Sequence, residues 1–345
     1  MKLFKLSAVA LFSALSIVSC TKDETVENVS LGAYENGFLV LNEGGNKSGT
    51  VTYISNDLGT IKKDIYGAEN NGDVIGKYAQ NIFYNANTAY IVAGGSNQVV
   101  VVDKNTFKTK TKITKDFVAP RYGVVVGDKA YVTNANTYSY ANPATGNTDD
   151  YVAVINTTTN SVEKKIDLGI TADRILAYNN TLYITEPYNS TKLVIVDLKD
   201  NSVDKSLEIG SGTNSMEIKN GILYMLNDNG LVSVNLSNNQ LTTTVLGKDF
   251  AGAKNLDIEG DAFFFTVGTK AFRGNIVNRS VDTKEIFNYT STSQYGAAYG
   301  FKVVGGNIFI ADGGDFASEG KIFVYSTSGN LIKEIGTGIG PNGFY

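Results

Sequence analysis

Residues 127–134 read Gly-Asp-Lys-Ala-Tyr-Val-Thr-Asn, which is a tight-turn pair followed by a short hydrophobic strand centred on Tyr131. The same pattern returns about every 40 to 50 residues along the chain. A period of this length is typical of repeat proteins. Seven copies align on a central residue, which is aromatic in all but the first: Val40, Tyr90, Tyr131, Tyr183, Tyr224, Phe264 and Phe309.

Each central residue follows a pair of residues that tolerates the positive φ angles of two-residue hairpin turns. The pairs are Asn36-Gly37, Ala86-Asn87, Gly127-Asp128, Asn179-Asn180, Asn220-Gly221, Gly260-Asp261 and Gly305-Gly306. After each central strand come a loop, a β-branched strand such as 99–102 and a fourth strand such as 109–113. Four short strands at a period of roughly 40 to 45 residues describe one blade of a β-propeller.

The sequence therefore predicts an all-β protein, a seven-bladed β-propeller with four-stranded antiparallel blades. Alternation with a period of two residues dominates, and no amphipathic stretch of helical length follows the N-terminus. The first copy begins at its second strand, whereas residues 338–345 resemble the lead-in to an inner strand elsewhere, such as residues 212–216. We expect the C-terminus to supply the inner strand of the first blade, because this pairing removes the open sheet edges of the ring.

The N-terminus has the pattern of a secretory signal. Lys2 and Lys5 precede an apolar run that is too short to span a membrane comfortably. Cys20 at the end of this segment resembles a bacterial lipobox, which implies a signal peptide over 1–19 and a lipidated Cys20. Residues 20–33 then form the lipidated cysteine and a polar tether, and 34–345 form the propeller. Residues 21–24 resemble the short Lys-acidic signal of Bacteroidetes surface lipoproteins, which implies the outer face of the outer membrane, with the periplasmic face as the alternative.

Missing residue types exclude several kinds of chemistry. The chain has no His, no Trp and a single Cys, so Ser-His-Asp and Cys-His nucleophilic systems and the usual zinc ligand sets are excluded, as are disulfides. The formal net charge is -4 and no basic stripe is present. Nucleic acid is therefore not an expected partner, and the membrane is an expected partner only through the lipid anchor.

Two functions of acidic residues stay open as alternatives: catalysis by paired carboxylates and binding of a calcium ion. Paired carboxylates for a hydrolase or lyase exist formally, but they have no fixed spacing that the reaction would demand. Asp312-Gly313-Gly314-Asp315 offers oxygen ligands for a structural calcium ion, although such clusters are more often simple turns. We expect no catalytic residues, no metal centre and no cofactor.

The two largest departures from the repeat length are residues 67–80 and 134–150. In a propeller both map to the same end of the channel, where the segments that lead into inner strands meet the loops between second and third strands. Insertions that collect on one face often mark the binding face of a repeat protein. Aromatic rings with a few convergent polar groups suit a large, flat, partly polar ligand. The candidate ligand-binding residues are Tyr78, Arg121, Tyr138, Tyr140, Arg174, Tyr188, Asn214, Lys254, Phe272, Arg273 and Phe316.

Structural roles compete with ligand contact at several of these positions. We expect Tyr122 and Tyr299, next to strand starts, to pack in the core. Tyr138, Tyr140 and Phe316 lie in longer loops, where ligand contact is favoured. Arg121 and Arg174 fit either ligand contact or hydrogen bonds to neighbouring carbonyl groups around the channel.

The blades resemble the YVTN-type seven-bladed propellers of prokaryotic surface proteins. Tyr131-Val132-Thr133-Asn134 gives the motif itself, and Asp103 with Thr106 gives the turn that follows a blade's third strand. Further stretches resemble a Bacteroidetes subfamily of surface lipoproteins that includes cobalamin-capturing members: Asn42-Glu43-Gly44, Pro120-Arg121-Tyr122, Ala311-Asp312, Asp315-Phe316 and Gly338-Ile339-Gly340-Pro341.

The resemblance implies a non-catalytic surface lipoprotein that captures a corrinoid and works with a TonB-dependent outer-membrane transporter. Such a protein can grip the corrin ring and its amide fringe without a cobalt ligand, so the lack of histidine is no obstacle. The main alternative is a surface module that binds another protein, a glycan or another surface polymer. A carboxylate-based hydrolase or lyase is the third hypothesis.

Overall fold

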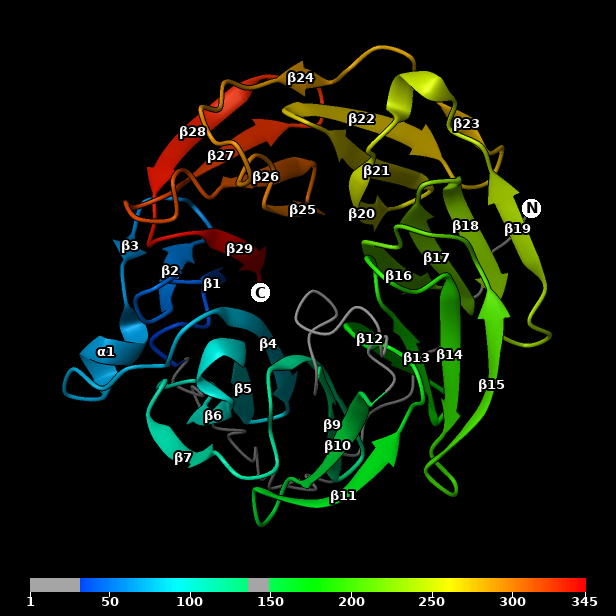
Figure 1. Cartoon of the computed structure of the whole chain (residues 1–345). Helices are drawn as coiled ribbons and strands as arrows, with labels where there is room; N and C mark the ends of the chain where they lie inside the picture. Colours follow the sequence, from blue (N-terminus) through cyan, green and yellow to red (C-terminus); the bar gives the residue numbers. More distant parts are fainter. Residues whose placement is uncertain (1–31, 136–148) are drawn as a thin grey trace, which may run out of the picture. The chain divides into compact units, whose positions relative to one another are not determined.

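Seven antiparallel sheets stand around a central channel, each with its first strand on the channel and its last strand at the rim (Figure 1). The computed structural model describes residues 32–135 and 149–345. Residues Gly32–Tyr345 belong to one unit. The predicted all-β, seven-bladed propeller is confirmed.

The first four blades are given from the channel outward. The first comprises β29 (Pro341–Phe344), β1 (Gly37–Asn42), β2 (Thr50–Ser55) and β3 (Ile61–Lys62). The second comprises β4 (Ala79–Asn85), β5 (Thr88–Ala93), β6 (Gln98–Asp103) and β7 (Thr109–Ile113). The third comprises β8 (Pro120–Val126), β9 (Lys129–Asn134), β10 (Tyr151–Asn156) and β11 (Ser161–Asp167). The fourth comprises β12 (Arg174–Tyr178), β13 (Thr181–Thr185), β14 (Lys192–Asp197) and β15 (Ser202–Glu208).

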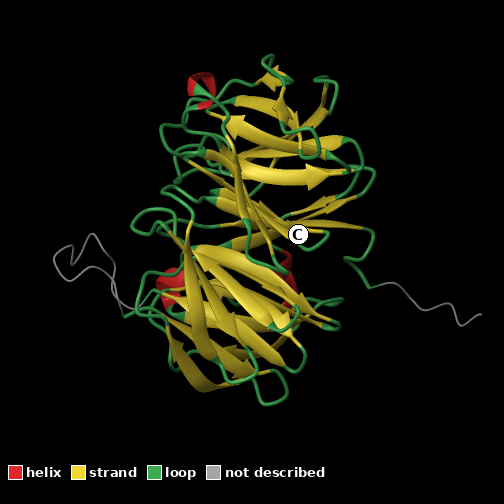
Figure 2. Cartoon of the chain, turned by 90° about the vertical axis from the view of Figure 1, so that its right-hand side faces the viewer, coloured by secondary structure: helices red, strands yellow, loops and turns green. Residues whose placement is uncertain are grey.

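The other three blades follow the same order. The fifth comprises β16 (Ser215–Lys219), β17 (Ile222–Asn227), β18 (Gly230–Asn235) and β19 (Leu241–Thr244). The sixth comprises β20 (Lys254–Glu259), β21 (Ala262–Val267), β22 (Lys270–Asn275), β23 (Ser280–Val281) and β24 (Phe287–Asn288). The seventh comprises β25 (Gly300–Val304), β26 (Asn307–Asp312), β27 (Lys321–Ser326) and β28 (Leu331–Gly336). Helical segments in the described chain are short: α1 (Ile65–Glu69), η1 (Gly94–Ser96) and η2 (Lys248–Phe250) (Figure 2).

Blade six carries an extra strand because its outer edge is interrupted. β23 pairs with Gly274 and Asn275 at one end of β22, and β24 pairs with Lys270 and Ala271 at the other end. Residues 282–286 leave the sheet between them. The two short strands together take the place of one fourth strand, so the blade keeps the four-layered plan of the others.

The repeated central residues lie in the second strand of each blade, as predicted. Of the turn pairs before them, Asn179-Asn180, Asn220-Gly221 and Gly305-Gly306 have positive φ at both residues. In the pairs Gly127-Asp128 and Gly260-Asp261, only the glycine has positive φ. Asn36-Gly37 and Ala86-Asn87 have positive φ at neither residue, so these two turns do not use the conformation that the sequence pattern predicted.

The C-terminal strand closes the ring, as predicted. β29 pairs antiparallel with β1, with Val40 opposite Phe344. Leu39 and Tyr345 exchange backbone hydrogen bonds of 2.8 and 2.9 Å. Phe344 also contacts the rings of Phe38 and Phe309, at centroid distances of 6.4 and 5.9 Å, so the C-terminal strand holds blade one against blade seven.

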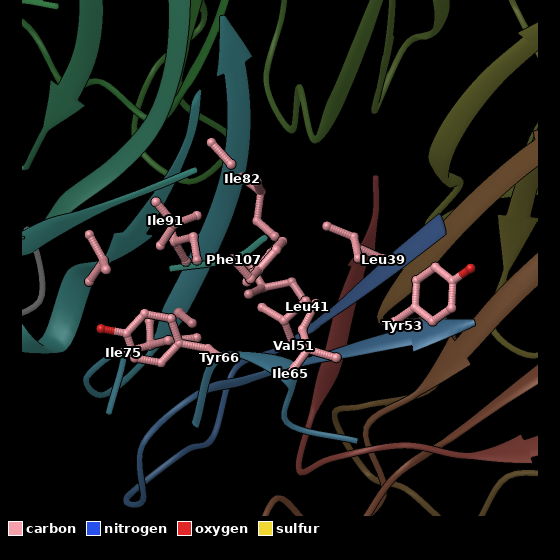
Figure 3. Packing of buried hydrophobic residues seen from close by; sticks show 14 of the residues in the cluster. Leu39, Leu41, Val51, Tyr53, Ile65, Tyr66, Ile75, Ile82, Ile91 and Phe107 are labelled. Atoms are coloured by element: carbon pink, nitrogen blue, oxygen red, sulfur yellow. The ribbon is translucent and has the colours of Figure 1, made fainter. Parts of the chain in front are cut away.

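The hydrophobic core is a series of clusters between neighbouring blades. Figure 3 shows the cluster that joins the first two blades, in which Leu41, Val51, Ile91 and Phe107 are fully buried. Because alternate side chains of a strand point to opposite faces, each sheet sends one set of apolar residues toward each neighbour. This packing replaces the disulfides that a chain with one cysteine cannot form.

Candidate ligand-binding site

A pocket of about 420 Å³ opens at one end of the channel. Its walls come from segments that lead into inner strands and from loops that follow second strands, which is the end of the ring predicted to bind ligand. We call it the channel-mouth pocket. Its lining residues are Glu43, Tyr78, Gln80, Gly94, Gly95, Arg121, Tyr122, Asp173, Arg174, Pro187, Tyr188, Asn214, Tyr299 and Asn342.

The pocket continues into the channel. A further cavity of about 300 Å³ lies between the inner strands and shares Tyr122, Arg174, Asn214, Tyr299 and Asn342 with the channel-mouth pocket. Both fall near the lower end of the size range of small-molecule sites. Their polar lining suits a ligand rich in hydrogen-bonding groups.

β-Bulges at the starts of inner strands place several pocket residues. The register shifts between Pro120 and Gly123 in β8, and the two residues inside this shift are Arg121 and Tyr122. A similar shift in β4 contains Gln80. A bulge locally bends the strand and redirects its side chains. In these blades the side chains of the bulge line the channel mouth.

Asp173 is the charged centre of the pocket. Its side chain is 7% exposed, and its Oδ1 atom lies 2.7 Å from the Nε atom of Arg121. Its Oδ2 atom lies 3.6 Å from the Nε atom of Arg174. A carboxylate so deeply buried requires compensating charge. The two guanidinium groups supply that charge from blades three and four, and Asp173 fixes their positions.

Tyr122 supports the same group. Its ring lies 4.1 Å from the guanidinium carbon of Arg174, which is a cation–π contact. Gln80 donates a 2.9 Å hydrogen bond to the Tyr122 hydroxyl. Burial raises the pKa of Tyr122 to about 12, so the phenol is neutral at physiological pH. As expected, Tyr122 packs against the buried cluster between blades three and four. It also lines the pocket, because the bulge in β8 places it at the channel mouth.

Glu43 and Tyr299 form the opposite wall, at the junction of blades one and seven. The Tyr299 hydroxyl donates a hydrogen bond to the Glu43 carboxylate. Burial raises the pKa of Glu43, while this hydrogen bond and the charge of Arg121 act in the other direction. Burial and the carboxylate of Glu43 both raise the pKa of Tyr299.

Phe316 lies behind Tyr299. The two rings meet edge to face at a centroid distance of 5.0 Å, and Phe316 does not line the pocket. Tyr299, which we expected to pack in the core, also lines the pocket. Phe316 fixes its ring because the loop after β26 folds back toward Gly340, and ligand contact by Phe316 stays a prediction.

Tyr78, Tyr188 and Asn214 also lie where the sequence analysis placed them. Tyr78 adopts a φ of 52° and stands against Gly95, whose absent Cβ would meet the Tyr78 ring at 2.3 Å. Tyr188 is 82% exposed at the rim. The Asn214 side chain donates to the backbone carbonyls of Gly212 and Ala253, each at 3.1 Å. With Arg121 and Arg174, these residues line the channel-mouth pocket, and ligand contact by them stays a prediction.

Besides Phe316, three further candidate residues do not line the channel-mouth pocket. Phe272 is 6% exposed and packs against Phe250 and Phe265, because it belongs to strand β22 and not to a loop. Arg273 is exposed on the same strand, 5.9 Å from the Phe264 ring. Lys254 donates a 3.2 Å hydrogen bond to the Ala297 carbonyl, and burial lowers its pKa. Lys254 thus bonds a neighbouring backbone carbonyl, which is the structural role that the sequence analysis considered for Arg121 and Arg174.

Tyr138, Tyr140 and Cys20 lie outside the described residues.

In the Asp312–Asp315 loop, Asp312 accepts a hydrogen bond from the backbone N–H of Gly314, and Asp315 accepts hydrogen bonds from those of Ala317 and Ser318. Within residues 32–135 and 149–345, no group of three or more His, Cys, Asp or Glu side chains is arranged to hold a metal ion. Over the same residues, no helix has the length and apolar character needed to cross a membrane.

Comparison with known families places the chain. A family model described as "Domain of unknown function (DUF5074)" matches residues 36–340. The chain belongs to the DUF5074 family. The DUF5074 match includes strands from all seven blades and ends just before β29. No curated protein matches the chain.

Solved structures share the fold at low identity. A quinonprotein alcohol dehydrogenase-like protein from Bacteroides thetaiotaomicron has a TM-score of 0.66 at 14% identity, over 90% of this chain and 78% of its own. Hydrazine synthase from Kuenenia stuttgartiensis gives 0.60 at 14% identity, over 79% and 92%. BamB from Moraxella catarrhalis gives 0.54 at 14% identity, over 91% and 86%. At these identities the likeness shows the propeller fold alone.

Proposed function

We propose that this DUF5074 protein is a non-catalytic binding protein that holds a corrinoid at the channel-mouth pocket. The observation that carries the proposal is the group of Arg121, Asp173, Arg174 and Tyr122, in which charged and aromatic side chains fix one another at the mouth of a cavity. Side chains that are already ordered lose little conformational entropy when a ligand binds. Such a group suits binding more than proton transfer, because its carboxylate is already paired with two cations.

A corrinoid fits the chemistry of this mouth. It is a large, flat ring with a fringe of amide groups, which need both donors and acceptors. Guanidinium groups donate, the carboxylates accept, and the amides of Gln80 and Asn342 can do both. The cavity of about 420 Å³ takes an amide-bearing edge of the ligand and not the whole molecule. Tyr188, 82% exposed at the rim, offers an aromatic face for the remaining flat surface.

The proposal includes a cellular setting. Residues 1–19 have the pattern of a signal peptide, Cys20 that of a lipidated cysteine and residues 20–33 that of a polar tether. A lipid-anchored protein in the outer membrane, exposed at the cell surface, would present the ligand to a TonB-dependent transporter. Removal of Cys20 should release the protein from membranes without changing its affinity for the ligand.

Gel filtration of residues 21–345 with cyanocobalamin tests the proposal, because the visible absorbance of the ligand reports whether it travels with the protein. These residues include the whole unit Gly32–Tyr345. We expect co-elution, and a loss of affinity of about tenfold for Tyr188→Ala or Arg174→Gln in calorimetry. Tyr295→Ala is the matched control, because Tyr295 is also an exposed tyrosine, at 75%, but does not line the pocket. Elution of the colour apart from the protein would refute capture of this corrinoid.

A partner protein or surface polymer is the second candidate. Tyr188 and Tyr295 are the most exposed tyrosines of the described chain, and exposed aromatic rings are typical of protein interfaces. In this case cyanocobalamin would elute alone, while Tyr188→Ala and Tyr295→Ala would both weaken capture of the partner. If the protein instead cleaves polysaccharides, and Glu43→Gln or Asp173→Asn abolishes this activity, the result would support the carboxylate-based hydrolase or lyase.

A further inference from the structure

Blade five departs from the repeat at its central aromatic residue. Tyr224 is half-buried, whereas its counterparts in the other blades are buried. The residue opposite Tyr224 on the third strand is small and polar. In blade six the residue opposite Phe264 is also polar, Arg273, but Phe264 is buried. Tyr224 faces Ser233, while the aromatic residues of four other blades face apolar residues that are 4% exposed or less: Val101, Val154, Ile195 and Val324.

A cavity of about 200 Å³ lies over this position, between blades five and six, which Figure 1 shows side by side. Its floor is one face of blade five. The register places Tyr224, Ser233 and Thr242 in one row across strands β17, β18 and β19. Ile276 and Arg279, from the turn between β22 and β23, form the opposite wall. The cavity is separate from the channel-mouth pocket and shares no lining residue with it.

Arg279 occupies a turn position that points toward the preceding blade. The equivalent residue of blade two, Phe107, is fully buried and contributes to the cluster between blades one and two. The position has a left-handed conformation, with φ of 58° at both residues. Asparagine, which tolerates this conformation better than arginine, occupies the position in blades three, four and five: Asn160, Asn201 and Asn239. At this position blade six thus has the exposed guanidinium of Arg279, whereas blade two has the buried ring of Phe107.

The cavity is rich in polar groups that have no protein partner. In the described part of the chain, the hydroxyls of Tyr224, Thr242 and Thr244, the Gln240 amide and the Arg279 guanidinium make no hydrogen bond to another residue. Ser233 donates to the Thr242 carbonyl at 3.3 Å. Arg279 is the one charged residue among those that line the cavity. Asp261 does not line the cavity, but its negative charge is close enough to raise the pKa of Tyr224.

We propose that the cavity formed by Tyr224, Ser233, Thr242, Gln240 and Arg279 binds one acidic pyranose unit of a saccharide. A pyranose has an apolar C–H face and a rim of hydroxyl groups. The Tyr224 ring receives the C–H face, and the hydroxyl and amide groups receive the rim. The guanidinium of Arg279 receives the carboxylate as a charge-assisted pair. A cavity of about 200 Å³ accommodates one sugar ring and leaves the rest of the chain in solvent.

Titration of residues 21–345 with trigalacturonic acid and with uncharged galactotriose, followed by calorimetry, tests the proposal. We expect the acidic sugar to bind about tenfold more tightly than the neutral one. Arg279→Asn should remove this preference, and it suits the fold because Asn occupies the same turn position in three other blades. Ser233→Val supplies the type of side chain that other blades have there. It should narrow the cavity beside Tyr224 and remove the Ser233 hydroxyl, so that both sugars bind more weakly.

Arg273→Asn is the matched control, since Arg273 is exposed on the neighbouring strand β22 but does not line the cavity. The affinity of Arg273→Asn for trigalacturonic acid should stay within about twofold of that of the unchanged chain. Thermal unfolding should show that all variants fold. Undiminished binding in Ser233→Val would overturn the proposal. So would the lack of saturable binding of trigalacturonic acid at concentrations up to about 10 mM, a range that still reveals weak complexes.

Discussion

Tyr90→Phe should stabilise the protein. Tyr90 is fully buried, and its hydroxyl has no hydrogen-bond partner within the described residues. The ring itself is well placed, because it stacks on Phe83 at a centroid distance of 5.0 Å and an interplanar angle of 8°. The substitution keeps this stacked ring and removes only the unpaired polar atom.

The size of the effect follows from the two terms that change. A buried hydroxyl without a partner costs about 1 to 3 kcal/mol, because it loses water and gains nothing in return. The space left by one oxygen atom is smaller than a methyl group, and its loss of contacts costs less than about 1 kcal/mol. The free energy of unfolding should therefore rise by about 1 kcal/mol.

Chemical denaturation followed by circular dichroism measures this change, with Tyr289→Phe as the contrast. Tyr289 is also buried, at 4% exposure, but its hydroxyl accepts a 2.6 Å hydrogen bond from the buried backbone N–H of Ala298. Its substitution leaves that N–H unpaired and should lower the free energy of unfolding by about 1 to 2 kcal/mol. A loss of stability in Tyr90→Phe comparable with that in Tyr289→Phe would falsify the reasoning.

Three further predictions concern charge and ring closure. Burial, with the nearby charge of Asp257, raises the pKa of Glu217 from 4.5 to about 7. The folded chain therefore retains a proton that the unfolded chain releases, and stability falls as pH rises through this interval. Glu217→Gln should flatten that fall in unfolding curves measured across the interval. Asp173→Ala should lower the free energy of unfolding by about 3 kcal/mol in denaturation experiments, because Arg121 and Arg174 lose their buried counterion. A chain that ends at residue 340 lacks β29 and should lose at least about 4 kcal/mol from unmade strand hydrogen bonds and ring contacts, seen as a lowered midpoint of thermal unfolding. An unchanged pH profile, free energy or midpoint would contradict the respective prediction.

The fold could be predicted because its signals are local and repeated. Turn pairs such as Gly127-Asp128 and β-branched strands such as 99–102 report the hairpins directly, and seven copies repeat the same information. Ring closure was also predictable, since the first copy lacks an inner strand and residues 338–345 resemble one. The end of the ring that contains the channel-mouth pocket followed from the loop insertions and the blade topology.

Individual pocket residues were harder to predict, because side-chain direction depends on bulges that have no clear sequence signature. The place of Tyr122 near a strand start indicated its packing against the core, but not that the bulge in β8 also places it in the pocket lining. Tyr299 lines the pocket with Phe316 behind it, because the loop after β26 folds behind the strand start. Glu43 and Asp173 were missed as pocket residues, since buried acids that pair across blades cannot be told from solvated ones in a sequence. The available signal was position: Asp173 directly precedes Arg174 at the start of β12, and Glu43 directly follows the end of β1.

The pairing of Val40 with Phe344 also has a consequence for biosynthesis. The two partners are separated by about 300 residues, so at translation rates of about 5 to 20 residues per second the first blade waits roughly 15 to 60 seconds for its inner strand. During that interval β1 offers a free hydrogen-bonding edge to any extended chain nearby. Until β29 is made, the nascent protein can pair with other chains through β1, and a chaperone that shields this edge would lower the risk of aggregation.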